Sequence, residues 1–153
     1  MEKLKTLSAS DVRHTAVRLL ARREHSRQEL QQKLLQRGFS LDLIQQELEK
    51  LVQKGLLSDE RFVENYARAR RNKGYGPLRI VVELQQRGVS GDLIDNYVDY
   101  AAEEWLELAE QIRQKRFGKK IPKDFNEKAK QMRFLQYRGF NMEHISKILS
   151  DKS

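Results

Sequence analysis

The sequence contains no cysteine, which excludes disulfide bonds, thiolate zinc sites and cysteine nucleophiles. No run of apolar residues approaches the roughly 18 that a membrane-spanning helix needs. The first residues, Met1 to Thr6, are not followed by the apolar stretch of a secretory signal. We therefore expect a cytoplasmic protein that makes no contact with a membrane.

Residue patterns of known catalytic and metal sites are also missing. The three histidines, His14, His25 and His144, form no H-E-x-x-H pair, and neither a G-x-S-x-G nor a Walker A sequence occurs. One glycine-rich loop, Lys73–Pro77, could cradle a phosphate, but it follows an expected helix where such loops follow a strand. Its simpler interpretation is a helix end followed by a helix that starts at proline. We expect no enzyme activity, no metal and no cofactor.

Charge is plentiful and unbalanced. Charged residues make up 34% of the chain, and 30 Lys and Arg against 22 Asp and Glu give a net charge of +8. A typical globular protein has about 25% charged residues. Such a positive surface favours an anionic partner, either a nucleic acid or an acidic protein surface.

An octapeptide recurs three times along the chain. Residues 37–44 (RGFSLDLI) return as 87–94 (RGVSGDLI) and, more weakly, as 138–145 (RGFNMEHI). The glycines at 38, 88 and 139 are therefore spaced by 50 and then 51 residues. A fixed period of this size is typical of proteins built from repeated structural units.

Each part of the octapeptide suits a tight turn between two helices. Glycine supplies the left-handed residue that ends one helix, and the apolar residue after it can pack back on the last turn. Ser or Asn then caps the next helix, and the acidic residue two places on favours its positive N-terminal end. The repeat therefore predicts a helix–turn–helix junction in each unit.

The segments between the octapeptides complete three units of three helices. A capping box, Ser26 with Glu29, opens one helix, Gly76-Pro77 opens its counterpart, and Asp124 with Glu127 opens the third. Apolar residues at helical spacing, such as Val12, Ala16 and Leu19, predict a longer helix at the start of each unit. No pattern typical of a strand appears. We predict an all-α protein of three tandem three-helix repeats in an elongated, curved array, with units at 8–57, 58–101 and 102–150.

Three groups of basic residues lie near predicted helix ends. The first basic group is Arg18, Arg22, Arg23 and Arg27. The second basic group is Arg68, Arg70, Arg71 and Lys73, with Tyr75 beside it. The third basic group is Arg113, Lys115, Arg116, Lys119, Lys120 and Lys123. Cations stabilise helix C-termini, but that effect accounts for one or two charges at each end. We therefore expect at least one group to bind a partner.

The sequence resembles the RecX family of bacterial recombination regulators. The resemblance lies in Arg23–Leu30 (REHSRQEL), Asp59–Phe62 (DERF) and Gly74–Pro77 (GYGP), together with the three Arg-Gly junctions, and it extends over about residues 13–150. It implies a protein that binds the RecA filament on single-stranded DNA and restrains its ATP hydrolysis and strand exchange in DNA repair. The resemblance gives the three basic groups a target, either acidic surfaces of the filament or the DNA phosphates inside its groove. We also expect the protein to be a monomer.

Two other classes of function stay open at this point. The first is a direct DNA-binding protein of the helix-turn-helix type, because three-helix units with short turns resemble that module. In the second unit of this chain, the third helix is predicted at Ser90–Tyr100. It carries Asp92, Asp95 and Asp99 and no cation, so it is poorly suited to bind in a DNA major groove. The second is a scaffold that binds an acidic protein without DNA.

Overall fold

A computed structural model describes residues 8–150, which form nine α-helices and no strand. Unit 1 comprises α1 (Ala9–Arg22), α2 (Arg27–Gln36) and α3 (Leu41–Gln53). Unit 2 comprises α4 (Asp59–Asn72), α5 (Pro77–Gln86) and α6 (Gly91–Tyr97). Unit 3 comprises α7 (Glu103–Phe117), α8 (Phe125–Arg138) and α9 (Met142–Leu149). The all-α prediction is confirmed.

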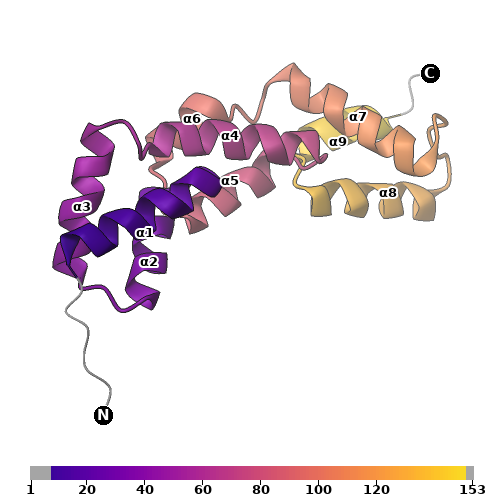
Figure 1. Cartoon of the computed structure of the whole chain (residues 1–153). Helices are drawn as coiled ribbons and strands as arrows, with labels where there is room; N and C mark the ends of the chain where they lie inside the picture. Colours follow the sequence, from indigo (N-terminus) through magenta and orange to yellow (C-terminus); the bar gives the residue numbers. More distant parts are fainter. Residues whose placement is uncertain (1–7, 151–153) are drawn as a thin grey trace, which may run out of the picture.

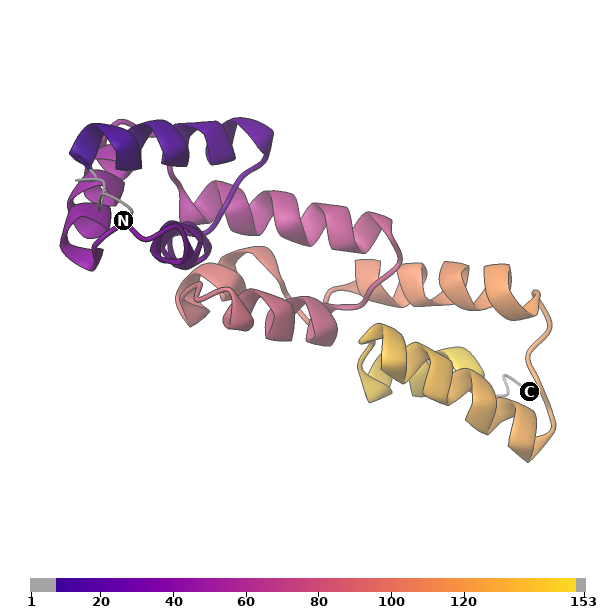
Figure 2. The same cartoon turned by 60° about the horizontal axis from the view of Figure 1, so that its bottom comes forward.

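The units follow one another along an elongated molecule (Figures 1 and 2). The main helix–helix contacts lie within units, where α1 and α2 pack on α3, α4 packs on α5 and α6, and α7 and α8 pack on α9. The second helices of the units, α2, α5 and α8, lie along the lower edge of Figure 1. An array of repeats, as predicted from the octapeptide, is the architecture of this chain.

The junction chemistry predicted from the octapeptide is confirmed in every unit. The glycines at 38, 88 and 139 have φ values of 92°, 76° and 98°, the left-handed region in which a Cβ is penalised. Ser40 and Ser90 accept the N–H groups of Leu43 and Leu93, and Asn141 accepts that of His144. The residues that follow the glycines, at 39, 89 and 140, are buried.

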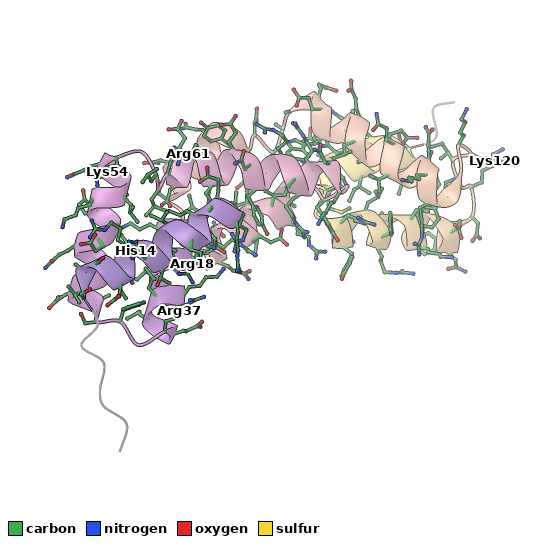
Figure 3. All side chains as sticks on the ribbon, in the orientation of Figure 1. His14, Arg18, Arg37, Lys54, Arg61 and Lys120 are labelled. Carbon is green, nitrogen blue, oxygen red and sulfur yellow. The ribbon has the colours of Figure 1, made fainter. Side chains whose placement is uncertain are left out.

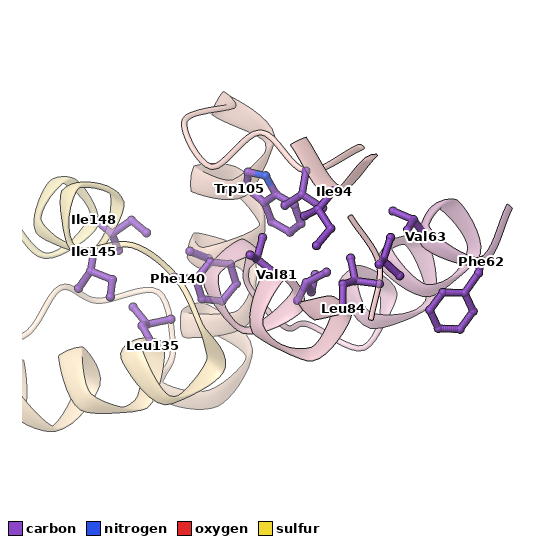
Figure 4. Packing of buried hydrophobic residues seen from close by; sticks show 14 of the residues in the cluster. Phe62, Val63, Val81, Leu84, Ile94, Trp105, Leu135, Phe140, Ile145 and Ile148 are labelled. Atoms are coloured by element: carbon purple, nitrogen blue, oxygen red, sulfur yellow. The ribbon is translucent and has the colours of Figure 1, made fainter. Parts of the chain in front are cut away.

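The hydrophobic core is divided between unit 1 and the other two units. One cluster of buried residues runs from Val12 to Leu57, and the second runs from Phe62 to Leu149. In the second cluster, Trp105 and Phe140 of unit 3 lie beside Val81 of unit 2 (Figure 4). Units 2 and 3 therefore share one core, whereas unit 1 has its own.

One detail differs from the sequence prediction. Helix α6 ends at Tyr97, because Val98 is extended and only 2% exposed, so its side chain enters the core where a helix would have continued to Tyr100. Asp99 consequently lies outside the helix, although Asp92 and Asp95 remain on it.

The same kind of hydrogen-bonded contact joins unit 1 to unit 2 and unit 2 to unit 3. The Ser26 hydroxyl, at the start of α2, donates to the carbonyl oxygen of Arg87 at 2.7 Å. At the next junction the N–H of Gly76, at the start of α5, donates to the carbonyl oxygen of Arg138 at 2.7 Å. At both junctions the acceptor lies in the Arg-Gly turn at the end of a unit's second helix. This turn contacts the start of the second helix of the preceding unit. We call this turn the Arg-Gly corner.

This contact explains the glycine-rich loop at residues 73–77. A Cβ built on Gly76 would lie 2.5 Å from the backbone carbonyl of Gly139, so only glycine lets the two chains approach. The loop ends α4 and starts α5 at Pro77, as the simpler interpretation of the sequence predicted. Its space is filled by unit 3, which accounts for the glycines without a phosphate.

Candidate functional site

The first basic group is partly tied to the protein. Arg23 forms an ion pair with Glu29 at 3.3 Å, and Arg27 forms one with Glu49 at 3.0 Å. Arg22 is exposed and pairs with no described carboxylate. Arg18, also exposed, is labelled in Figure 3. One face of α1 therefore offers cations to a partner, while the junction arginines are engaged within the chain.

The second basic group is mostly neutralised by neighbouring carboxylates. Arg68 pairs with Glu64 at 3.0 Å and Arg71 with Glu104 at 3.5 Å, both at exposed positions where ion pairs contribute little to stability. Lys73 is exposed and has no carboxylate partner in the described chain. This group offers less free positive charge than the sequence suggested.

Arg70 is held inside the same group by Glu83. Its Nε and Nη2 atoms donate to the two Glu83 carboxylate oxygens, each at 2.8 Å, and Tyr66 donates its hydroxyl to the same side chain. Burial acts to raise the pKa of Glu83, but the hydrogen bonds from Arg70 and Tyr66 outweigh it and hold that pKa below 4.5. Arg70 therefore acts in packing unit 2, with only 19% of its side chain exposed.

Arg113 was predicted to belong to the third basic group, and the structure shows that it does not. Its side chain is fully buried at 0% exposure, so it is unavailable to a partner. It pairs with Glu110 at 2.7 Å and donates to the backbone carbonyls of Gly118, Lys119 and Lys120. The buried arginine fixes the loop after α7, and this loop carries three exposed lysines, Lys119, Lys120 and Lys123.

The remaining members of the third group form the densest free positive charge in the described chain. All are exposed, and no described carboxylate pairs with any of them; they are Lys115, Arg116, Lys119, Lys120 and Lys123. They gather at the end of α7 and in the following loop, at the outer end of unit 3, where Figure 3 labels Lys120. The N-terminus of α8 lies at the same end and adds the positive pole of a helix dipole.

Sequence reasoning missed a row of stacked arginines and rings between units 2 and 3. The Arg138 guanidinium lies 5.0 Å from the Tyr75 ring centre and 5.4 Å from that of Phe134, while Arg79 lies 4.4 Å from Tyr75 and 5.1 Å from Tyr137. These distances are those of cation–π contacts. The residues come from α5, α8 and the loop between α4 and α5, so no short motif contains them.

Tyr75 was predicted beside the second basic group, and the structure places it at the centre of this row. Arg70 also stacks on its ring at 3.9 Å. The ring is half-buried, and the arginines stacked on it come from both unit 2 and unit 3, so it lies at the junction of the two units. On the exposed face of the adjoining α8 lie two more cations that the sequence analysis did not select, Lys130 and Arg133.

The described residues contain no group of three or more His, Asp or Glu side chains able to hold a metal ion. Among the helices described, none is both long and apolar enough to cross a membrane.

Models of known families match the chain in all three units. The first, second and third three-helix domains of RecX match residues 13–51, 58–97 and 102–149. The chain belongs to the RecX family. The regulatory proteins RecX of Pseudomonas entomophila and Halorhodospira halophila are each 46% identical to it. These alignments cover 92% and 88% of this chain and 91% and 83% of the relatives.

Solved RecX structures have the same fold. The crystal structure of RecX from Lactobacillus salivarius superposes with a TM-score of 0.79 at 21% identity, covering 92% of this chain and 94% of that one. A second RecX crystal structure has a TM-score of 0.76 at 21% identity, covering 95% and 79%. Membership in this family makes the chain a RecX regulatory protein.

Proposed function

We propose that this RecX protein binds the RecA filament on single-stranded DNA and inhibits its ATP hydrolysis and strand exchange during recombination and DNA repair. It acts in the cytoplasm as a monomer and catalyses no reaction itself. The proposal extends the regulatory role of the family to the partner and effect that the family resemblance implies.

One observation carries the proposal for this chain, namely the five exposed, unpaired cations at the outer end of unit 3. A filament of protein on DNA is strongly anionic, and cations without carboxylate partners are the ones that can exchange counterions with it. The elongated shape also supports a partner that is itself extended, because it spreads contacts over several units (Figure 1).

The structure gives less support to sequence-specific reading of DNA by unit 2. Helix α6 has seven residues and presents Asp92 and Asp95 at its exposed positions. Carboxylates on a helix of this length would be repelled by the phosphates that flank a major groove. We therefore place DNA contacts, if the filament DNA is reached, at the cations of unit 3.

The test measures phosphate release by RecA on single-stranded DNA with ATP. The wild-type protein should slow hydrolysis while hydrolysing no ATP alone. Replacing Lys119 and Lys120 by Glu should raise the concentration needed for half inhibition about tenfold and make it less dependent on salt.

The matched control reverses two exposed charges elsewhere, Lys54→Glu with Lys147→Glu, so that net charge changes equally. Equal inhibition by wild type and the Lys119/Lys120 variant would remove this cluster from the interface. No inhibition by the wild-type protein would overturn the proposed function.

A further inference from the structure

The Arg-Gly corner is a docking element that this chain uses twice on itself. Arg87 and Arg138 each present a carbonyl oxygen to the first turn of a helix in the preceding unit, and each accepts a hydrogen bond there at 2.7 Å. The Gly139 carbonyl accepts a second one, from the N–H of Leu78 at 2.9 Å. At the second junction the donors are backbone N–H groups at a helix start, which have no partner within their own helix, whereas at the first junction the donor is the Ser26 hydroxyl.

The side chains at the first of these junctions add an ion pair. Arg87 Nε lies 3.8 Å from Oε2 of Glu29, a residue in the first turn of α2. The glycine allows close approach, because a Cβ on Gly88 would collide with the Gln28 side chain at 1.8 Å. At this junction the corner therefore meets a carboxylate in the first turn of the helix, whereas α5, which the Arg138–Gly139 corner meets, has no acidic residue there.

The third copy of the corner, Arg37–Gly38, has the same backbone. Arg37 has φ −85° and ψ 1°, against −90° and 6° for Arg87. The N–H of Phe39 bonds the carbonyl of Leu34 at 3.4 Å, as the N–H of Val89 bonds that of Leu84 at 3.4 Å. The carbonyl oxygen of Arg37 is consequently oriented as that of Arg87 is, at the end of the second helix of its unit.

Nothing in the described chain occupies this third corner. Arg37 is exposed, no described residue donates to its carbonyl oxygen, and no described carboxylate pairs with its guanidinium (Figure 3). A Cβ built on Gly38 would meet no atom within 4 Å, in contrast to Gly88 and Gly139. Among the described residues, unit 1 has no preceding unit that could fill its corner.

The helix start of unit 3 that corresponds to those of α2 and α5 does not suit the corner of a second copy. Aligning Gly139 with Gly88 places Glu127 at the position of Gly76, but Glu127 lies inside α8, whose N-cap is Asp124. The extra turn at the start of α8 occupies the docking position. The loop before it carries Lys119, Lys120 and Lys123, which would repel Arg37.

We propose that the Arg37–Gly38 corner binds the N-terminus of a helix in a partner protein, one with a carboxylate in its first turn. The proposal rests on the proposed function, which supplies the partner: the protein subunits of the RecA filament. The carbonyl of Arg37 accepts a backbone N–H, as that of Arg138 does from Gly76, and its guanidinium pairs with the carboxylate, as Arg87 pairs with Glu29.

The first experiment uses the absence of cysteine. Gln36, exposed beside the corner, is replaced by cysteine and labelled with a benzophenone, and Gln111→Cys on the exposed face of α7 is the control. Each labelled protein is bound to RecA on single-stranded DNA and irradiated. The label at position 36 should attach to RecA within the first two turns of a helix with Asp or Glu near its start. Attachment only to DNA or within a helix interior, while the labelled protein co-sediments with the filament, would overturn the proposal.

The second experiment reverses charge at the corner. Arg37→Glu should weaken filament binding about fivefold or more, because it removes an ion pair and brings two carboxylates together. Lys54→Glu makes the same change at an exposed position of unit 1 and should alter binding less than twofold. Thermal melts of both variants establish that they fold.

The results separate the two proposals. Equal binding by wild type and the Arg37 variant would overturn the docking role of the corner and leave filament binding intact. Absence of binding by the wild-type protein would overturn the proposed function, and the docking proposal would fall with it.

Discussion

At the residue scale, arginines that look alike in the sequence have opposite roles. Arg116 is exposed at the end of α7, whereas Arg113, three residues earlier, is completely buried and saturated with acceptors. Three residues are about 300° of helix turn, so the two side chains point only about 60° apart. Arg113 bonds Gln131 of α8, whereas Arg116 lies at the exposed edge of the same face. A charge in a cluster can thus be a structural group, and burial decides which it is.

Loss of the Arg113 side chain should destabilise the fold strongly. Arg113→Ala leaves the backbone carbonyls of Gly118, Lys119 and Lys120 without their donor, and each buried acceptor left unsatisfied costs about 1–3 kcal/mol. Lys115→Ala, at an exposed position of the same helix, should change the free energy of unfolding by under about 0.5 kcal/mol. Urea unfolding measures both, and similar midpoints for the two variants would contradict the structural role of Arg113.

The ion pair between Arg70 and Glu83 predicts a pH-dependent contribution to stability. The folded pKa of Glu83 lies below its ordinary 4.5, so its stabilisation is present above that pH and is lost as the pH falls through the folded value. Glu83→Gln should therefore be less stable than wild type at pH 7, and the difference should shrink below pH 4.5. A constant difference across an acid titration followed by circular dichroism would contradict this prediction.

At the element scale, a helix start in this protein is completed by the following unit. The hydroxyl of Ser26 accepts the N–H of Glu29 within α2 and donates to the carbonyl of Arg87 in unit 2. Gly76 has no side chain to cap α5, and Arg138 and Gly139 of unit 3 provide the acceptors. The elements are therefore coupled along the array by backbone groups.

Gly76→Ala tests this coupling without backbone strain. Gly76 has φ −88°, which suits any residue, but the new Cβ would lie 2.5 Å from the carbonyl of Gly139. Overpacking of this kind costs about 1–3 kcal/mol. Gly91→Ala, at the start of α6 where a Cβ meets no atom within 4 Å, should be neutral or slightly stabilising. Equal melting temperatures for the two variants would show that units 2 and 3 are not packed at this point.

At the scale of the whole molecule, the array has two cores and two unlike ends. Unit 1 is a separate hydrophobic cluster joined to unit 2 mainly by polar contacts, such as Arg61 with Glu24 at 2.9 Å. The end at unit 3 is covered by the longer α8, and the end at unit 1 leaves the Arg37–Gly38 corner exposed. Partners therefore meet different chemistry at the two ends.

The elongated shape predicts a large radius of gyration. A compact protein of 153 residues would have a value of about 15 Å by the scaling of globular domains. The three units lie in a row, so solution scattering of the monomer should give a clearly larger value. A radius at the compact figure would mean that the units fold back on one another in solution.

The sequence alone determined the helices, their order and their junctions. Caps such as Ser26 and Asp124 and the left-handed glycines act within a few residues of themselves, so short patterns reveal them. The period of the octapeptide predicted three similar units, and these local signals were confirmed except at the end of α6.

Only the tertiary structure decided which charges are free. Arg113 is paired through a loop that folds back on α7, Arg70 is paired with a residue of another helix, and the rings around Arg138 come from two units. These partners come from other elements of the fold. The burial of each side chain therefore depends on packing that no local pattern specifies. For the same reason the open Arg37–Gly38 corner could be recognised only beside the two corners that are filled.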